Sequence, residues 1–262
     1  MVRFIRVILC LVLAATASGC AKPGSDGKER AAQLLEEKYS ESFRIVRETK
    51  NSGTYFDVVA SPKNNPEILF TASIDKNDDN FSDDYVNRIV CWKINQMIIR
   101  NISSIDDFVD FNGVKSSRPI PGDIQSYTHT IGFKAQCDNK EIPIQEYASL
   151  TSDFKVRTDL FILPDSNMDP GDLYWHLSNA YDGIRSINGN IMLYVVNNRQ
   201  MRDVRNYLNE NADLGLEFSE MAEEYITLFV SYEDGVPEMS EAEFTRAYAE
   251  AVKDAATGEQ ES

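Results

Sequence analysis

One acidic stretch carries oxygen-bearing side chains at alternate positions, with a further acid just beyond it. The four residues are Asp75, Asn77, Asp79 and Asp83. Carboxylate and amide oxygens spaced in this way are what a calcium-binding loop provides. However, Asn80 stands where the EF-hand pattern has glycine, and Val86 stands where it has the bidentate glutamate. The stretch therefore predicts either a Ca²⁺ site or a solvated turn whose acids cap the following helix.

Catalytic motifs are not evident in the sequence. The chain has only two histidines, His129 and His176, so a hydrolase of the Ser-His-Asp type would have to use one of them. We find no Gly-x-Ser-x-Gly, no phosphate-binding loop, no dinucleotide fingerprint and no zinc-ligand spacing. We therefore predict a protein that is not an enzyme and has no cofactor other than the Ca²⁺ considered above. A cell-wall hydrolase with an unrecognised site is kept as an alternative.

Four cysteines are present, and two of them, Cys10 and Cys20, lie in the N-terminal segment. The other two, Cys91 and Cys137, lie in the body of the chain. Outside the cytoplasm these two could form a disulfide. Cys91 could equally be a buried thiol, because it lies within a predicted helix beside Trp92.

The first twenty residues have the pattern of an export signal. Arg3 and Arg6 precede an apolar run over residues 7–17, which is too short for a spanning helix of about 20 residues. The segment Ala17-Ser18-Gly19-Cys20 resembles the lipobox of bacterial lipoproteins, although Ala17 stands where that family usually has leucine. The resemblance implies cleavage before Cys20 and attachment of acyl chains to it. Cleavage after Ala17, which would release a soluble protein, is the alternative.

Composition indicates an acidic globular protein. The 262 residues include 26 Lys and Arg against 42 Asp and Glu, and 42% of the residues are hydrophobic. Removal of residues 1–19 takes away two arginines and leaves a balance of −18. Such a surface repels phosphate backbones and anionic lipid headgroups, so nucleic acid is excluded as a partner. Membrane attachment is therefore expected to depend on the acyl chains of Cys20.

Residues 30–100 resemble N-terminal modules of lipoproteins from Gram-positive bacteria. The matching features are Tyr39 before Phe43, Tyr55, Pro62 with Pro66, Phe70, and Asp83-Asp84-Tyr85. The resemblance implies a location at the extracytoplasmic face of the cell membrane and no particular chemistry.

Hydrophobic periodicity predicts helices and strands in both halves of the chain. In the first half we expect a helix over residues 28–39 and strands over 43–48, 55–60 and 68–74. A helix then follows to residue 99, with Ser82 as its N-cap and an apolar stripe. The stripe consists of Tyr85, Ile89, Trp92, Gln96 and Ile99.

In the second half, strands are expected over residues 154–163, 191–196 and 226–230. Residues 126–135 could be helix or strand, and 144–150 a short helix. Asp169 is expected to cap a helix running to Ile184, Asn188-Gly189-Asn190 to form a turn, and a helix to start at Asn198. The pattern Ser240-Glu241-Ala242-Glu243 is a capping box that predicts a last helix.

These elements predict an α+β fold of two small helix-on-sheet layers behind a cleaved signal. The expected parts are a signal at 1–19, the lipidated Cys20 with a tether to 27, α+β units at 28–115 and 123–236 joined by a linker at 116–122, and a helix with a disordered tail at 237–262. The function expected is a lipid-anchored extracytoplasmic protein that binds a protein partner or a cell-envelope component. The alternatives are the hydrolase and a solute- or calcium-binding lipoprotein that uses the acidic loop or an inter-domain cleft.

Overall fold

A computed structural model describes the fold of residues 27–258, apart from several internal segments. The residues left undescribed between these limits are 52, 79, 104–107, 110–114, 117–121, 132–135, 152–153, 165–168, 185–186 and 211–224. The predicted signal, Cys20, most of the tether, most of the predicted linker at 116–122 and the tail at 259–262 lie outside the described residues. None of the described helices is long and apolar enough to cross a bilayer.

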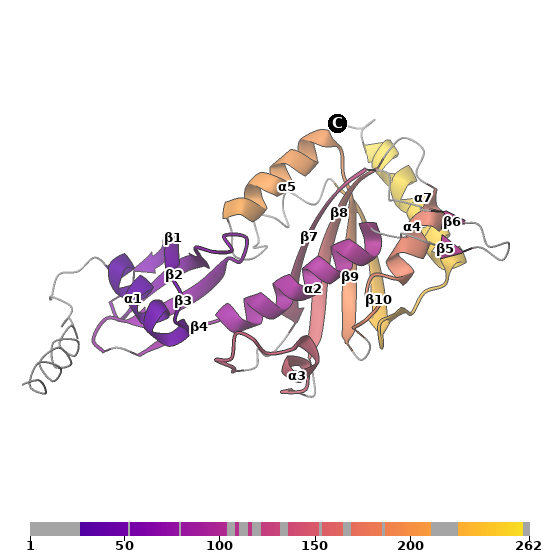
Figure 1. Cartoon of the computed structure of the whole chain (residues 1–262). Coiled ribbons are helices and arrows are strands. Elements are labelled where there is room, and N and C mark those ends of the chain that lie inside the picture. Colours follow the sequence, from indigo (N-terminus) through magenta and orange to yellow (C-terminus); the bar gives the residue numbers. More distant parts are fainter. Residues whose placement is uncertain are drawn as a thin grey trace, which may run out of the picture.

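The first unit is a four-stranded antiparallel sheet with a helix packed on one face (Figure 1). Its elements are α1 (Gly27–Tyr39), β1 (Phe43–Asn51), β2 (Tyr55–Pro62), β3 (Phe70–Asp75) and β4 (Phe81–Asp83). The strands lie in chain order. Ala31, Leu35 and Tyr39, spaced by four residues, form one buried stripe on α1, as the periodicity predicts.

The helix α2 (Tyr85–Ser103) starts three residues later than the predicted cap, Ser82. That prediction is wrong because Ser82 belongs to β4, where it pairs with Ser73 of β3. Asp83 takes the capping role instead: its Oδ1 accepts a hydrogen bond of 3.0 Å from the backbone N–H of Tyr85. A three-residue strand is too short to show a period of two in the sequence.

The buried face of α2 also differs from the predicted stripe. Its fully buried column is Val86, Val90, Ile94, Ile98 and Ile102, at a constant spacing of four. Tyr85 and Ile89 are buried as predicted, whereas Trp92 and Ile99 are half-buried and Gln96 is exposed. The last three side chains line a cleft, and Trp92 also packs against the core.

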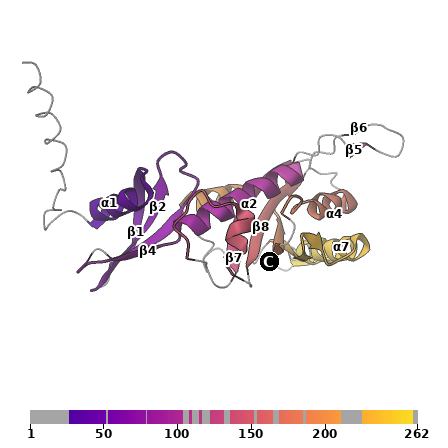
Figure 2. The ribbon, with the colours of Figure 1, turned by 60° about the horizontal axis from the view of Figure 1, so that its bottom comes forward.

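The second sheet has five strands in the order β11-β10-β9-β8-β7. Figure 2 shows β7 and β8 of this sheet beside α2. The strands are β7 (Gly122–Ile131), β8 (Lys155–Pro164), β9 (Asn188–Val195), β10 (Ile226–Glu233) and β11 (Val236–Pro237). Only β8 and β9 are parallel, and α4 (Pro170–Ser178) lies in the crossover that a parallel pair requires. A separate pair, β5 (Phe108–Val109) and β6 (Lys115–Ser116), lies outside this sheet.

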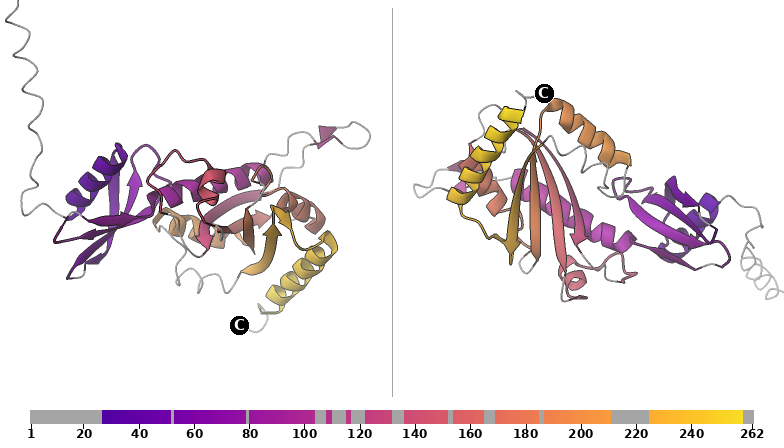
Figure 3. Two further views of the ribbon diagram at one scale, coloured as in Figure 1. Left: turned by 90° about the horizontal axis from the view of Figure 1, so that it is seen from below. Right: turned by 180° about the vertical axis from the view of Figure 1, so that it is seen from behind.

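Helices cover both faces of the second sheet. Residues of α2, α4 and α7 (Glu241–Gly258) share a core with one face, and α5 (Asn198–Glu210) packs its Met201 and Val204 on the other. Figure 3 shows α5 at one end of the sheet, and the short helix α3 (Ile144–Ala148) lies near β7 and β8.

The predicted helix starts in this half hold, but one turn and one helix end do not. Asp169 accepts hydrogen bonds from the N–H groups of Gly171 and Asp172, and Ser240 forms the expected capping box with Glu243. The helix after Asp169, expected to reach Ile184, ends at Ser178. Residues 188–190, expected as a turn, begin β9, because Gly189 pairs there with Val156 of β8 and Tyr232 of β10.

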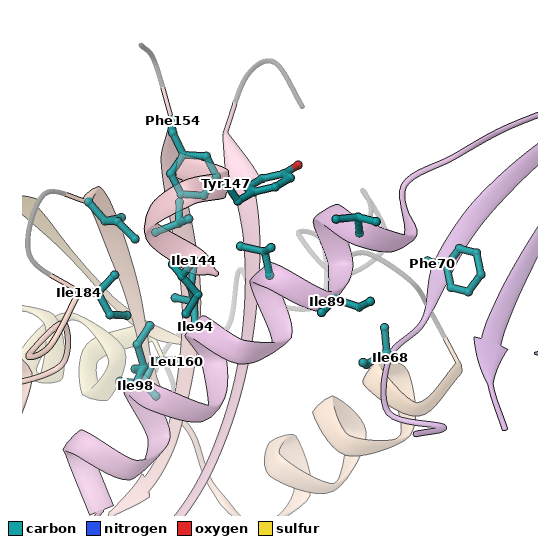
Figure 4. Packing of buried hydrophobic residues seen from close by; sticks show 14 of the residues in the cluster. Ile68, Phe70, Ile89, Ile94, Ile98, Ile144, Tyr147, Phe154, Leu160 and Ile184 are labelled. Atoms are coloured by element: carbon teal, nitrogen blue, oxygen red, sulfur yellow. The ribbon is translucent and has the colours of Figure 1, made fainter. Parts of the chain in front are cut away.

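One hydrophobic core extends through both units (Figure 4). Alternating residues of β8 face it, as predicted, from Val156 to Ile162. In Figure 4, Ile89 of α2 lies toward Ile68 and Phe70 of the first unit, while Ile98 lies toward Leu160 of the second. The α+β class and the two helix-on-sheet layers are thus confirmed.

Candidate functional site

A cleft of about 480 Å³ lies where the two units meet. Its wall comes from α2, from β7, from the loop before β3 and from the C-terminal end of α5, which reaches toward that loop in Figure 1. The polar, charged and aromatic side chains of the described lining include Arg44, Glu67, Arg88, Trp92, Gln96, Gln125, Tyr127 and Asn209. The volume falls within the range of small-molecule sites.

Asn95 of α2, which lines the cleft, forms hydrogen bonds to β7 through both the nitrogen and the oxygen of its side-chain amide. Its Nδ2 donates to the carbonyl oxygen of Ser126 at 3.1 Å. Its Oδ1 accepts hydrogen bonds from the hydroxyls of Ser126 at 2.7 Å and Thr128 at 3.0 Å. A satisfied polar network of this kind holds the helix at one register against the strand.

Arg88 is the charged side chain held most firmly at this site. Its Nε donates to the carbonyl oxygen of Leu69 at 3.1 Å, which ties α2 to the loop before β3. Its guanidinium carbon lies 4.6 Å from the ring centroid of the buried Tyr127, a cation–π contact. Arg88 is therefore oriented before any ligand binds, and its side chain is half-buried.

Two further lining residues form a pair across the cleft wall. The indole Nε1 of Trp92 donates to Oε2 of Glu67 at 3.2 Å. Glu67 is the only carboxylate among the described residues of the lining. Arg44, on the exposed side of β1, brings a second positive charge to the same cleft.

A buried charge cluster lies on β7, β8 and β9, next to the cleft but not part of its lining. The Asp159 side chain is 1% exposed, and its Oδ1 accepts hydrogen bonds from Arg157 Nη2 at 2.7 Å and from the Tyr194 hydroxyl at 3.2 Å. Its Oδ2 lies 3.8 Å from Nδ1 of His129. The ring of His129 in turn contacts that of Tyr127, with centroids 5.6 Å apart.

Burial governs protonation in this cluster. Burial raises the pKa of Asp159, and the hydrogen bonds and charge of Arg157 only partly oppose this. Burial and the nearby Asp159 carboxylate raise the pKa of Tyr194 to about 12. For Arg157, burial acts downward but the bond to Asp159 outweighs it, so the pKa of the guanidinium rises.

The predicted calcium ligands do not converge. Asp83 is engaged elsewhere: its Oδ2 is 3.0 Å from Lys38 Nζ, and its Oδ1 accepts from the Tyr39 hydroxyl at 2.7 Å. Asp83 pairs with Ala72 of β3, and Ala72 lies three residues before Asp75 on the same strand. At the rise of a strand, Asp83 and Asp75 are therefore about 10 Å apart along the strand direction. Asp75 accepts a hydrogen bond from the N–H of Asn77 at 2.8 Å.

Three of the four predicted ligands, Asp75, Asn77 and Asp83, lie among the described residues. Asp79 lies outside the described residues, and the described members behave as the turn-and-cap alternative expects. Among the described residues, no group of three or more His, Cys, Asp or Glu side chains is placed to hold a metal ion.

The predicted disulfide is not formed. Cys91 and Cys137 are both thiols in the structure, the first buried and the second half-buried. Cys91 Sγ lies 3.9 Å from Oδ1 of Asn87, one turn earlier on α2. The buried-thiol alternative for Cys91 therefore holds.

Neither histidine lines the cleft. His129 is half-buried beside Asp159, and His176 is buried on α4, the core position that its helix favours. Arg44 and Arg88, in contrast, are site residues that no sequence motif indicates. One signal was available: Gln96 is a polar residue within the predicted apolar stripe of α2, and it marks the side of the helix that faces the cleft.

Comparison with known proteins gives a fold but no family. The sequence matches no known family profile and no curated protein. The structure is similar to that of a DUF5037 family protein from Ruminococcus gnavus, with a TM-score of 0.63 and 15% sequence identity. The match covers 86% of this chain and 99% of the other. Neither sheet with its helices makes up that share of the chain, so the match includes both units. The arrangement of both units with α2 between them thus recurs in a second protein.

Proposed function

We propose that the protein is anchored at the extracytoplasmic face of the cell membrane by acyl chains on Cys20. There it binds a component of the cell envelope in the cleft between its two units, without catalysing a reaction. The observation that carries the proposal is the cleft itself, in which side chains from both sheets, α2 and α5 converge on a volume suited to a small ligand.

The anchor and the cleft are compatible in position. An extended chain spans at most about 3.6 Å per residue, so the segment from Cys20 to Gly27 reaches about 25 Å at most. The folded part would therefore stay close to the bilayer surface, where envelope components are the ligands at hand. Two or three acyl chains on one cysteine supply stable attachment, whereas a single chain holds only marginally.

The alternative functions use different features of the molecule. A solute-binding lipoprotein would use the same cleft, with a diffusing ligand in place of an envelope component. A calcium-binding role through the acidic loop loses its main support, since Asp83 bonds to Lys38 and Tyr85. The described lining of the cleft includes neither His129 nor His176, so it offers no histidine for a hydrolase of the Ser-His-Asp type.

The anchor is tested by mass spectrometry of the mature N-terminus. We expect Cys20 as the first residue, carrying acyl chains through its sulfur, and we expect Cys20→Ser to abolish metabolic labelling with palmitate. A free N-terminal Ser18 would show secretion by simple cleavage and would contradict this part of the proposal.

Occupancy of the cleft is tested by photocrosslinking in living cells. A photoreactive amino acid replaces Gln96, which is exposed and lines the cleft, and in a matched variant it replaces Leu150, which is 50% exposed and lies outside the lining. We expect an envelope-derived adduct from position 96 only. Equal adducts from both positions, or none from position 96, would overturn binding in the cleft.

A further inference from the structure

We infer that the ligand of the cleft is a small polyhydroxy compound that carries a carboxylate or phosphate group, and that Arg88 and Arg44 bind this oxyanion. The inference rests on the proposed function, because it names the class of ligand that the same cleft would take.

The first support is the state of Arg88. Its Nε is committed to the carbonyl oxygen of Leu69 and its flat face lies on the ring of Tyr127. Its two terminal nitrogens make no hydrogen bond or ion pair with the part of the chain that the structure describes. Because Arg88 lines the cleft, these terminal N–H groups are available to a ligand. A planar pair of donors matches the two oxygens of a carboxylate or phosphate.

The second support is the local charge balance. The chain carries an excess of 16 negative charges, so most arginines could find a carboxylate. Arg44 nevertheless makes no ion pair with a described residue, as is the case for Arg88. Glu67 of the same lining is bonded to the indole of Trp92. The cleft is thus locally positive in an acidic protein, which favours an anionic guest.

The third support is the set of amides around the two arginines. Gln96, Gln125 and Asn209 line the cleft, and none of them makes a hydrogen bond with a described residue. Amides both donate and accept, so they suit hydroxyl groups. Trp92 lies half-buried in the same wall, and its indole can pack against a sugar-like ring. Oxyanion, hydroxyls and ring together define an acidic sugar or a sugar phosphate.

The test is titration calorimetry on the acylated mature chain in detergent micelles, with three probes. Glucuronate supplies a carboxylate, glucose 6-phosphate supplies a phosphate, and glucose supplies the same ring without charge. We expect at least one anionic probe to bind ten times or more tightly than glucose, and the tighter of the two identifies the oxyanion. Binding should weaken as salt is added.

Variants assign the effect to the arginines. Arg88→Gln is expected to weaken binding of the anionic probe tenfold or more, and Arg246→Gln, an exposed arginine on α7 away from the cleft, is expected to leave it unchanged. If Arg88→Gln does not fold, as judged by its thermal transition, Arg44→Gln replaces it, since Arg44 is exposed.

Two results would overturn the inference: no binding of either anion, or binding of glucose as tight as that of the anions. Unchanged binding in both Arg88→Gln and Arg44→Gln would overturn it as well. All of these would leave the proposed function standing if position 96 still crosslinks in cells. The converse result, in which anions bind but position 96 gives no adduct, would reject the proposed function instead.

Discussion

Asp159 is a carboxylate whose burial outweighs the attraction of its arginine partner. A buried ion pair is weak evidence for stability, because desolvation can cancel the Coulombic gain. Here only one of the two carboxylate oxygens accepts hydrogen bonds from described residues, those of Arg157 and Tyr194, and Oδ2 faces His129 at 3.8 Å. The raised pKa of Asp159 follows from this one-sided arrangement.

The pKa of Asp159 predicts how stability depends on pH. A group whose folded pKa lies above its unfolded value of about 3.9 contributes stability that is fully present below that pH and is lost as pH rises through the folded pKa. Asp159→Asn does not titrate. The melting-temperature advantage of the wild type over Asp159→Asn should therefore be largest near pH 3.5 and shrink toward pH 7. An advantage that grows over this range would contradict the assignment.

At the scale of elements, the sequence predicts the start of a helix well where a side chain close in sequence caps it. The capping box of α7 is such a case: Ser240 N–H donates to Glu243 Oε2 at 2.8 Å, and Glu243 N–H donates to Ser240 Oγ at 3.4 Å. Both partners lie within four residues, so the sequence contains the whole interaction.

Ser240→Ala is expected to lower the free energy of unfolding by about 1 kcal/mol at pH 7, since it removes the N-cap. The hydrogen bonds from Ser240 lower the pKa of Glu243, so their contribution is present at neutral pH and is lost as pH falls through the folded pKa. The effect of Ser240→Ala should thus be smaller at pH 3 than at pH 7 in denaturant titrations. Thr245→Ala, at an exposed position of the same helix, is the control. An equal loss in both variants would contradict the capping role.

The sequence predicts less well the features that depend on contacts with distant parts of the chain, such as which face of a helix is buried. Strand β10 is predicted correctly because its buried residues alternate with more exposed ones, with Leu228, Val230 and Tyr232 on the buried face. The predicted face of α2 differs from the buried one because Trp92 and Gln96 are at helical spacing from Ile89, whereas the side that is buried depends on β7 and α5. The cleft arginines escape sequence reasoning for the same reason, because Arg44 and Arg88 lie on separate elements and come together only in the folded protein.

At the scale of the whole molecule, α2 determines whether the two units are independent. The predicted boundary at residues 116–122 assigns α2 to the first unit, and that boundary remains a prediction. In the structure, however, Ile94, Ile98 and Ile102 of α2 belong to a core shared with β8 and α4. Loss of the first unit with α2 would therefore expose the interior of the second, and the similar protein contains both units over 99% of its length.

This shared helix predicts a single cooperative unfolding transition by scanning calorimetry of the mature chain. Ile94→Ala removes a fully buried side chain from the centre of α2 and should cost about 2–5 kcal/mol, moving that one transition to lower temperature without splitting it. Ile131→Ala, at a 36% exposed position of β7, is the matched control and should have a much smaller effect. Two separate transitions, with only one of them shifted by Ile94→Ala, would show that the units fold on their own. The cleft between them could then open without unfolding either unit, and its arginines would no longer be held in place by the fold.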